Sequence, residues 1–407
     1  MKRGNISLSK LILFSVALLT LLISGTTVYS LEQFKRLRDI TLVVLFVLLL
    51  MNALVNLNAG KLKKRLAIVT IGALVFFAGS FISFPSESIH FFSKVLMFVL
   101  FSYLLYDEKN AKFIFKYLYD LIVVISVVAL VFFVTLYVLK IPLPYTLLNN
   151  GFYRSYMYLF YNADIYKESF GSFAYYRLQG VFWEPGVYGI YLILALFYYA
   201  FIDEEKDKRK LYIIVICLLL TSSTTGTALG LVVFGVLLLS KIKKQNERLL
   251  VLIPISLLAC LVGYYLLIAK KYGGGGYSAS YNLRMVDLTN SFDIWRNHFF
   301  WGTGYNNVAE FEAATRLYQR HNSNGFMNWC MTMGLWGLIA QVLPLVVNII
   351  KTKNRGRIIH IAFAIIYVGI NMTEPLITSP LMIMLIAFEY VMMVNKYGGN
   401  ELNGFKR

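Results

Sequence analysis

The sequence predicts an all-α polytopic membrane protein with about twelve transmembrane helices. Of its 407 residues, 58% are hydrophobic and only 15% are charged. The mean hydropathy of +0.64 lies outside the range of soluble globular proteins. Apolar runs long enough to cross ~30 Å of hydrocarbon as helices recur along the whole chain. A soluble core has no use for so many runs of this length.

The apolar runs divide the chain into five parts. An N-terminal bundle of about five helices covers 1–139, central helices cover 186–269, and C-terminal helices with a cytoplasmic tail cover 326–407. Two long polar segments, 140–185 and 270–325, separate these parts. The expected spans lie near 11–29, 40–57, 66–84, 89–105, 117–139, 186–202, 211–223, 226–240, 249–269, 326–350, 358–372 and 376–394.

The distribution of lysine and arginine orients the chain. Most of the 39 basic residues fall in short segments that share one side of the membrane. The positive-inside rule places this side, with both termini, in the cytoplasm and both long polar segments outside. The short outer loop with Lys35, Arg36 and Arg38 departs from the rule. This topology accounts for the net charge of +18, so nucleic acid is not an expected partner.

The two outer segments carry more arginine than lysine. A guanidinium group binds phosphate in a bidentate manner and stays charged at any working pH, so this bias suits a phosphate-bearing ligand, with ordinary surface charge as the alternative for any one of these arginines. The first outer segment is also rich in aromatic residues. These rings suit either a membrane–water boundary or, near Arg177, the stacking of sugar rings.

The first outer segment ends in Arg177-Leu178-Gln179-Gly180-Val181-Phe182-Trp183-Glu184-Pro185-Gly186. Pro185 fits the first turn of the next helix, and Glu184 fits that helix's positive end. Glu184 is therefore either a capping carboxylate or a group that orients Arg177 or accepts a proton. Further on, Thr221-Ser222-Ser223-Thr224-Thr225-Gly226 predicts a polar break between two short spans, which lines a cavity or is packed by protein.

The second outer segment predicts three elements in order. Residues 282–297 have the pattern of an amphipathic helix that lies on the membrane or covers a site. Gly302-Thr303-Gly304 predicts a tight turn. His321 follows Arg320 at the mouth of a span, where it is either a structural hydrogen-bonding group or a catalytic base.

No metal site or cofactor is expected. Cys217, Cys260 and Cys330 fall in or beside apolar runs, and no His, Cys, Asp and Glu cluster has metal-ligand spacing. The chemistry is therefore expected to be metal-independent.

Four motifs occur in the same order as in a known family. They are Arg177-x-x-Gly180-x-Phe182-x-Glu184-Pro185, the Thr221–Gly226 break, Arg284 upstream of Gly302-x-Gly304, and His321-Asn322 before Met333-Gly334-Leu335-x-Gly337. Over roughly 170–390 the chain resembles the O-antigen and capsule repeat-unit polymerases (Wzy) and their relatives, the O-antigen ligases. Relatives often carry Arg in the break, where this chain has Thr224 and Thr225.

The resemblance implies a GT-C-like membrane glycosyltransferase of the bacterial cytoplasmic (inner) membrane. Such an enzyme transfers an undecaprenyl-pyrophosphate-linked oligosaccharide to a sugar hydroxyl of another lipid-linked unit at the outer face. By this resemblance Arg177 and Arg284 hold the pyrophosphate, with Arg320 as a further candidate, and His321 or else Glu184 is the base. Membrane lipid, a chain-length regulator and a flippase are the implied partners.

Two alternatives stay open. An O-antigen ligase shares these motifs and transfers finished polymer to a different acceptor. A lipid-linked oligosaccharide flippase or another transporter would use Lys94, Asp120 and Glu389, which fall within expected spans. Each of the three lies close enough to a span end for its charged group to reach the interface.

Overall fold

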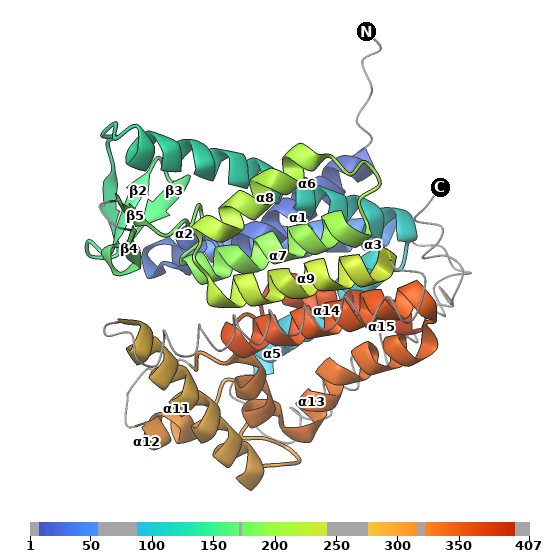
Figure 1. The fold of residues 1–407 in the computed structure, drawn as a ribbon. Coiled ribbons are helices and arrows are strands. Elements are labelled where there is room, and N and C mark those ends of the chain that lie inside the picture. The colour runs from blue at the N-terminus through green and yellow to red at the C-terminus, as the bar shows by residue number, and fades with distance from the viewer. Residues whose placement is uncertain (1–7, 56–87, 171–172, 242–275, 316–321, 395–407) are drawn as a thin grey trace. The chain divides into compact units, whose positions relative to one another are not determined.

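A computed structural model describes residues 8–55, 88–170, 173–241, 276–315 and 322–394. The described chain is mainly helical (Figure 1), as the composition predicts. It divides into two compact units. The first comprises Met1–Leu45 and Phe113–Leu266, and the second comprises Phe46–Lys112 and Leu267–Arg407.

The first unit is built around α7. Its described helices are α1 (Leu8–Ile23), α2 (Thr27–Ser30), the start of α3 (Lys35–Val55), most of α6 (Glu108–Phe133), α7 (Pro185–Phe201), α8 (Lys208–Leu220) and α9 (Thr224–Lys241). A π-helical turn, Val134–Val138, prolongs α6. α7 packs against both α8 and α9 (Figure 1). Gly226 and Gly230 on α9 leave room for Leu218, so these helices approach closely.

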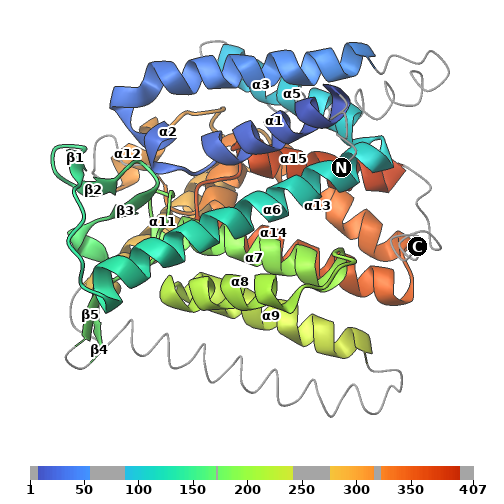
Figure 2. The same cartoon turned by 90° about the horizontal axis from the view of Figure 1, so that it is seen from above.

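The first long polar segment, 140–185, contains strands, whereas the sequence predicted only a loop. β1 (Thr146–Leu148), β2 (Tyr153–Tyr156) and β3 (Phe160–Asn162) form an antiparallel sheet, and β4 (Lys167–Phe170) pairs with β5 (Phe173–Tyr176). Asn149, Asn150 and Gly151 at positive φ make the tight β1–β2 turn. Tyrosine and phenylalanine favour strands because they pack well on a pleated surface. The three-stranded sheet lies beside the end of α6 (Figure 2).

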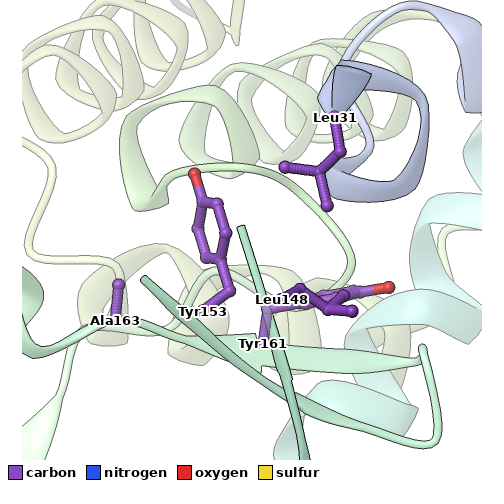
Figure 3. Packing of buried hydrophobic residues seen from close by; sticks show 5 residues of the cluster. All are labelled: Leu31, Leu148, Tyr153, Tyr161 and Ala163. Carbon is purple, nitrogen blue, oxygen red and sulfur yellow. The ribbon is translucent and has the colours of Figure 1, made fainter. Parts of the chain in front are cut away.

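A small hydrophobic cluster joins this sheet to the N-terminal segment. Leu148, Tyr153, Tyr161 and Ala163 are buried together with Leu31 (Figure 3). Val28, Phe34 and Tyr166 pack around them. The aromatic-rich segment therefore has a core of its own, and that core ties it to the start of the chain.

The second unit contains the remaining described helices. They are α5 (Ser88–Leu105), α11 (Gly276–Asn297), α12 (Ala309–Thr315), α13 (Gly325–Lys351), α14 (Asn354–Thr373) and α15 (Pro380–Val394). α13 packs against α11, α14 and α15, and α15 also packs against α5. Buried polar bonds join these helices: the Tyr367 hydroxyl donates to Gln341 at 2.6 Å, and the Tyr390 hydroxyl donates to the Ala340 carbonyl at 2.9 Å.

The helices have the length and surface of membrane spans. Within the described ranges, Glu32–Leu54, Glu108–Val138, Gly325–Lys351 and Gly356–Thr373 are long and apolar enough to cross a bilayer, and five shorter apolar helices accompany them. Val47 on α3 and Val131 on α6 are among the large apolar side chains that face outward. Soluble monomers rarely expose such stripes, whereas lipid covers them. The protein is therefore a multi-pass membrane protein.

The expected spans near 66–84 and 249–269 lie outside the described residues. Each of the other expected segments overlaps a described helix. The total of about twelve spans and the GT-C-like arrangement stay predictions.

Candidate functional site

Arg177 binds the end of a helix in the first unit. Its Nε donates to the Thr221 carbonyl at 2.8 Å, and its Nη2 donates to the Ser222 carbonyl at 3.2 Å. The guanidinium also lies 6.0 Å from the centre of the Tyr166 ring. Thr221 and Ser222 follow α8, whose last carbonyls have no partner inside the helix and carry its negative end. Arg177 therefore closes the C-terminus of α8 and carries a positive charge to the α8–α9 break.

The predicted polar break is confirmed as the link between α8 and α9. Ser222 has a φ of 47°, and the hydroxyls of Tyr175 and Ser222 lie 3.1 Å apart. The Ser223 hydroxyl accepts from the amide of Gly226 at 3.1 Å and so satisfies one free N–H of the first turn of α9. Serine and threonine suit this place because their hydroxyls hydrogen-bond the neighbouring backbone.

Glu184 is the N-cap residue of α7, directly before Pro185, as the sequence predicts. Its backbone is extended (φ −152°, ψ 158°), but its carboxylate makes no hydrogen bond to the first turn of the helix. The Tyr153 hydroxyl donates to the carbonyl of Trp183, the neighbour of Glu184, at 2.9 Å. Burial, and after it the Glu184 charge, raises the pKa of Tyr153 to about 12. Glu184 is thus a charged neighbour of a buried tyrosine.

Arg284 in the second unit is paired with a buried carboxylate. Its Nη2 lies 3.4 Å from Oε1 of Glu374, which ends α14. The Glu374 side chain is 7% exposed, while that of Arg284 is 37% exposed. A carboxylate buried to this extent requires a charged or hydrogen-bonding partner. Arg284 therefore binds Glu374 with one side of its fork and remains more than one-third accessible.

The corner before α13, residues Asn322–Asn324, is bound to α11 by buried hydrogen bonds. Oδ2 of Asp287 accepts from the amide of Ser323 at 3.1 Å and from its hydroxyl at 2.6 Å. The Asn322 amide donates to the Ser291 hydroxyl at 2.5 Å. The Asn324 side chain accepts from the Met327 amide and caps α13. Asp287 itself is only 1% exposed, so its hydrogen bonds to Ser323 are shielded from water.

Three segments of the second unit meet at this corner. A Cβ at Gly325 would lie 2.6 Å from the carbonyl oxygen of Glu374, so only glycine permits the approach of α13 to the Glu374-Pro375 turn. Arg284 and Asp287 lie one turn apart on α11 and bind Glu374 and Ser323 respectively. His321 and Arg320, at the same corner in the sequence, lie outside the described residues, and their roles stay predictions.

α13 is broken where the predicted tight turn meets it. Gly334 is non-helical (φ 64°, ψ −157°) inside α13. The amides of Thr303 and Gly304 donate to the carbonyls of Met331 and Thr332, each at 2.9 Å, and the Leu335 amide donates to Phe299 at 2.7 Å. The turn thus satisfies backbone groups that the break leaves open. Irregular backbone at the depth of a membrane span needs such a protein partner.

Sequence reasoning missed Asp287 and Glu374. Asp287 follows Arg284 by three residues, which places both on one face of the expected amphipathic helix. Glu374 precedes Pro375 between two apolar runs, and the same Glu-Pro pair occurs at 184–185. A carboxylate at the end of an apolar run, directly before proline, is the signal that would have found it.

The charges that favoured a transporter have structural partners. Nζ of Lys210 lies 2.9 Å from Oδ1 of Asp120. The sequence suggested that the Glu389 carboxylate reaches the membrane interface. This is wrong, because Glu389 is only 2% exposed. It accepts from the Asn348 amide at 2.5 Å, and its Oε2 lies 3.5 Å from Nδ1 of His360. Three helices enclose it, which is why it cannot extend to the membrane surface.

Arg177 belongs to the first unit and Arg284 to the second. Each binds its own helix end, and their convergence on one ligand stays a prediction.

The fold and these sites define a multi-pass helical membrane protein in which arginine and carboxylate side chains bind helix ends, and glycine residues permit close backbone contacts at a broken helix. Residues 211–342 match a family model, Wzy_C, described as O-Antigen ligase. The match includes the α8–α9 break, Arg284, Asp287, the glycine turn and the first part of α13. The predicted resemblance to the O-antigen ligases and polymerases is therefore confirmed over this part of the chain. No curated protein matches the chain.

Proposed function

We propose that the protein is a polysaccharide polymerase. It transfers an undecaprenyl-pyrophosphate-linked oligosaccharide onto a sugar hydroxyl of another lipid-linked unit, at the outer face of the cytoplasmic membrane. The observation that carries the proposal is Arg284, which lies in the matched family region, is held by the buried Glu374 and stays 37% exposed. A guanidinium that is oriented on one side and open on the other suits a diphosphate ligand.

The reaction needs fixed positive charge more than it needs covalent chemistry. The acceptor oxygen forms a bond to the anomeric carbon of the donor sugar, the bond from that carbon to the diphosphate oxygen breaks, and undecaprenyl pyrophosphate leaves. Negative charge develops on the departing diphosphate, where pre-oriented donors lower the barrier most. In the proposal Arg284 supplies this charge directly.

The other predicted residues take subsidiary roles. Arg177 holds the α8–α9 break and brings positive charge to it, and Arg320 is a further diphosphate ligand. The acceptor's hydroxyl proton passes to His321 or else to Glu184. Guanidinium groups, and not a metal ion, supply the positive charge that stabilises the departing diphosphate. Activity should therefore persist when divalent cations are chelated.

Reconstitution tests this proposal. The purified protein in proteoliposomes receives a purified lipid-linked repeat unit, and the product is sized. Products with many repeat units are expected, and Arg284→Ala should lower the rate on the order of 10²–10³-fold. Arg296→Ala is the matched control, because Arg296 lies exposed in the last turn of the same helix. Unchanged long-chain product from both Arg284→Ala and Arg177→Ala would end the assignment.

The ligase alternative predicts a different product. A ligase attaches finished polymer to a separate acceptor and leaves single lipid-linked units unextended. A flippase moves the labelled unit across the membrane with no change in chain length. Product size and transbilayer movement, measured in the same vesicles, separate the three functions.

A further inference from the structure

Two neighbouring tight turns in the first unit have left-handed backbone but residues of opposite character, polar in one turn and apolar in the other. The β1–β2 turn has Asn149, Asn150 and Gly151 at φ values of 52°, 53° and 89°. These are the residues that tolerate left-handed backbone most readily. The β2–β3 turn has Met157 and Tyr158 at 54° and 58°. Neither residue favours this conformation, so the turn itself does not explain their presence.

The side chains of the second turn are also exposed. Met157 is 67% exposed, Tyr158 47% and Leu159 50%. Core packing therefore does not explain them either. Three consecutive apolar residues at the tip of a hairpin, two of them in a strained conformation, indicate a surface that an apolar partner covers.

Ring contacts place the turn at the level of span ends. Phe160 stacks on Phe132 of α6, with ring centres 5.4 Å apart and an interplanar angle of 10°. Phe132 lies within the candidate span Glu108–Val138, about 9 Å of helix before its end. Tyr158 contacts Phe34 edge-on at 6.3 Å, and Phe34 lies in the first turn of the candidate span Glu32–Leu54. The turn is thus next to the ends of two spans.

We propose that the Met157–Leu159 turn inserts into the interfacial layer of the phospholipid bilayer that α3 and α6 cross. A tyrosine ring with its hydroxyl toward water and aliphatic groups toward the acyl chains is typical of this layer. Lys35 and Arg36 are exposed and follow Phe34 directly, so the proposed insertion brings them near the lipid phosphates. Their position accounts for the outer loop that departs from the positive-inside rule. This inference does not depend on the proposed function.

Fluorescence in lipid vesicles tests the insertion. The full chain, with Cys217, Cys260 and Cys330 replaced by alanine, receives one cysteine by Leu159→Cys, labelled with an environment-sensitive dye. Asn150→Cys, at the exposed polar turn of the same sheet, is the matched control. Vesicles contain only phosphatidylethanolamine and phosphatidylglycerol. We expect the dye at 159 to be quenched by lipids brominated near the headgroup, and several-fold less by aqueous iodide than the dye at 150.

Equal iodide quenching at the two positions overturns the proposal. So does a dye at 159 that is open to iodide in pure lipid but protected in native membranes, because a protein would then cover the turn. If the Leu159→Cys protein fails to accumulate, Met157→Cys decides by the same criteria. A second variant, Met157→Asn with Tyr158→Gly, gives the hairpin an ordinary turn. It should keep its thermal stability in detergent and lose lipid quenching at 159.

Discussion

The guanidinium of Arg284 and the carboxylate of Glu374 meet at 3.4 Å, although 90 residues separate them in the sequence. The carboxylate is buried and the guanidinium is partly exposed. The contact joins α11, where the sequence predicts an amphipathic helix, to the C-terminal end of α14. An arginine held in this way loses little freedom when it binds a second anion.

If Glu374 acts through Arg284, their substitutions will not be additive. We expect Glu374→Gln to raise the KM for the lipid-linked donor roughly tenfold with a smaller effect on kcat, because it weakens the orientation of a binding group. The double variant with Arg284→Ala should be no worse than Arg284→Ala alone. Glu310→Gln is the control, because Glu310 is exposed and its carboxylate contacts His298 instead of Arg284. Multiplicative losses in the double variant would show that the two residues act independently.

Substitution of Arg177 should unfold the α8–α9 break. Arg177→Ala removes two charge-assisted hydrogen bonds to the carbonyls of Thr221 and Ser222. We expect a loss of about 2–3 kcal/mol of stability. Arg177→Lys should restore little, since an ammonium group lacks the planar fork that reaches both carbonyls. Thermal unfolding in detergent measures this, and a lysine variant as stable as the parent contradicts it.

Gly302 should not tolerate a side chain. A Cβ there would lie 2.4 Å from the Thr332 carbonyl, and the residue has a φ of +69°. Conformational strain and the clash together should cost Gly302→Ala roughly 2–4 kcal/mol. Gly151→Ala is the control, because Gly151 also has positive φ but nothing within 4 Å of a Cβ. Equal unfolding temperatures for the two variants would disprove the role of the close approach.

Asp287 should matter as a hydrogen-bond acceptor more than as a charge. Both bonds from Ser323 reach the same carboxylate oxygen, Oδ2. Asp287→Asn keeps an oxygen at this place and should retain most of the polymerisation rate, whereas Asp287→Ala should lose it together with stability. Rates and unfolding temperatures of the two variants are the measurement. An inactive but stable Asp287→Asn protein would instead assign Asp287 a role that needs its charge.

Glu389 should serve the fold and not the reaction. Glu389→Gln keeps an acceptor for Asn348 and should leave the polymerisation rate unchanged. Glu389→Ala leaves buried polar groups without a partner and should cost about 1–3 kcal/mol. Activity per folded molecule, from proteoliposomes of known protein content, is the measurement. A large rate loss in a stable Glu389→Gln protein would show that this carboxylate takes part in the reaction.

The helices were predictable because span length and apolar runs are local properties of a sequence. The break at Thr221–Gly226 and the turn at Gly302–Gly304 were predictable for the same reason, since glycine and hydroxyl residues mark them. The strands within 140–185 were not predictable, because the short aromatic stretches also fit a membrane interface. A fixed pairing of β2 with β3 depends on burial against Leu31 and Phe132, which are distant in the sequence.

The partners of the site residues could not be predicted. Arg177 is predicted to be a phosphate ligand, and nothing in the sequence indicated that its Nε and Nη2 also donate to carbonyls 44 and 45 residues away. Glu374 and Asp287 lack a recognisable motif, and only the packing of α11 against α13 and the end of α14 gives them partners. A residue type states what a side chain is able to bind, whereas the fold decides what lies within reach.

The shared backbone bonds between the glycine turn and the break in α13 also bear on local opening. The amides of Thr303, Gly304 and Leu335 donate to carbonyls on the opposite segment. Neither segment can release its amides to solvent while the other stays in place. Hydrogen exchange at these three positions should therefore proceed with one common protection factor, as a single cooperative unit that is more stable than an exposed loop of the same length.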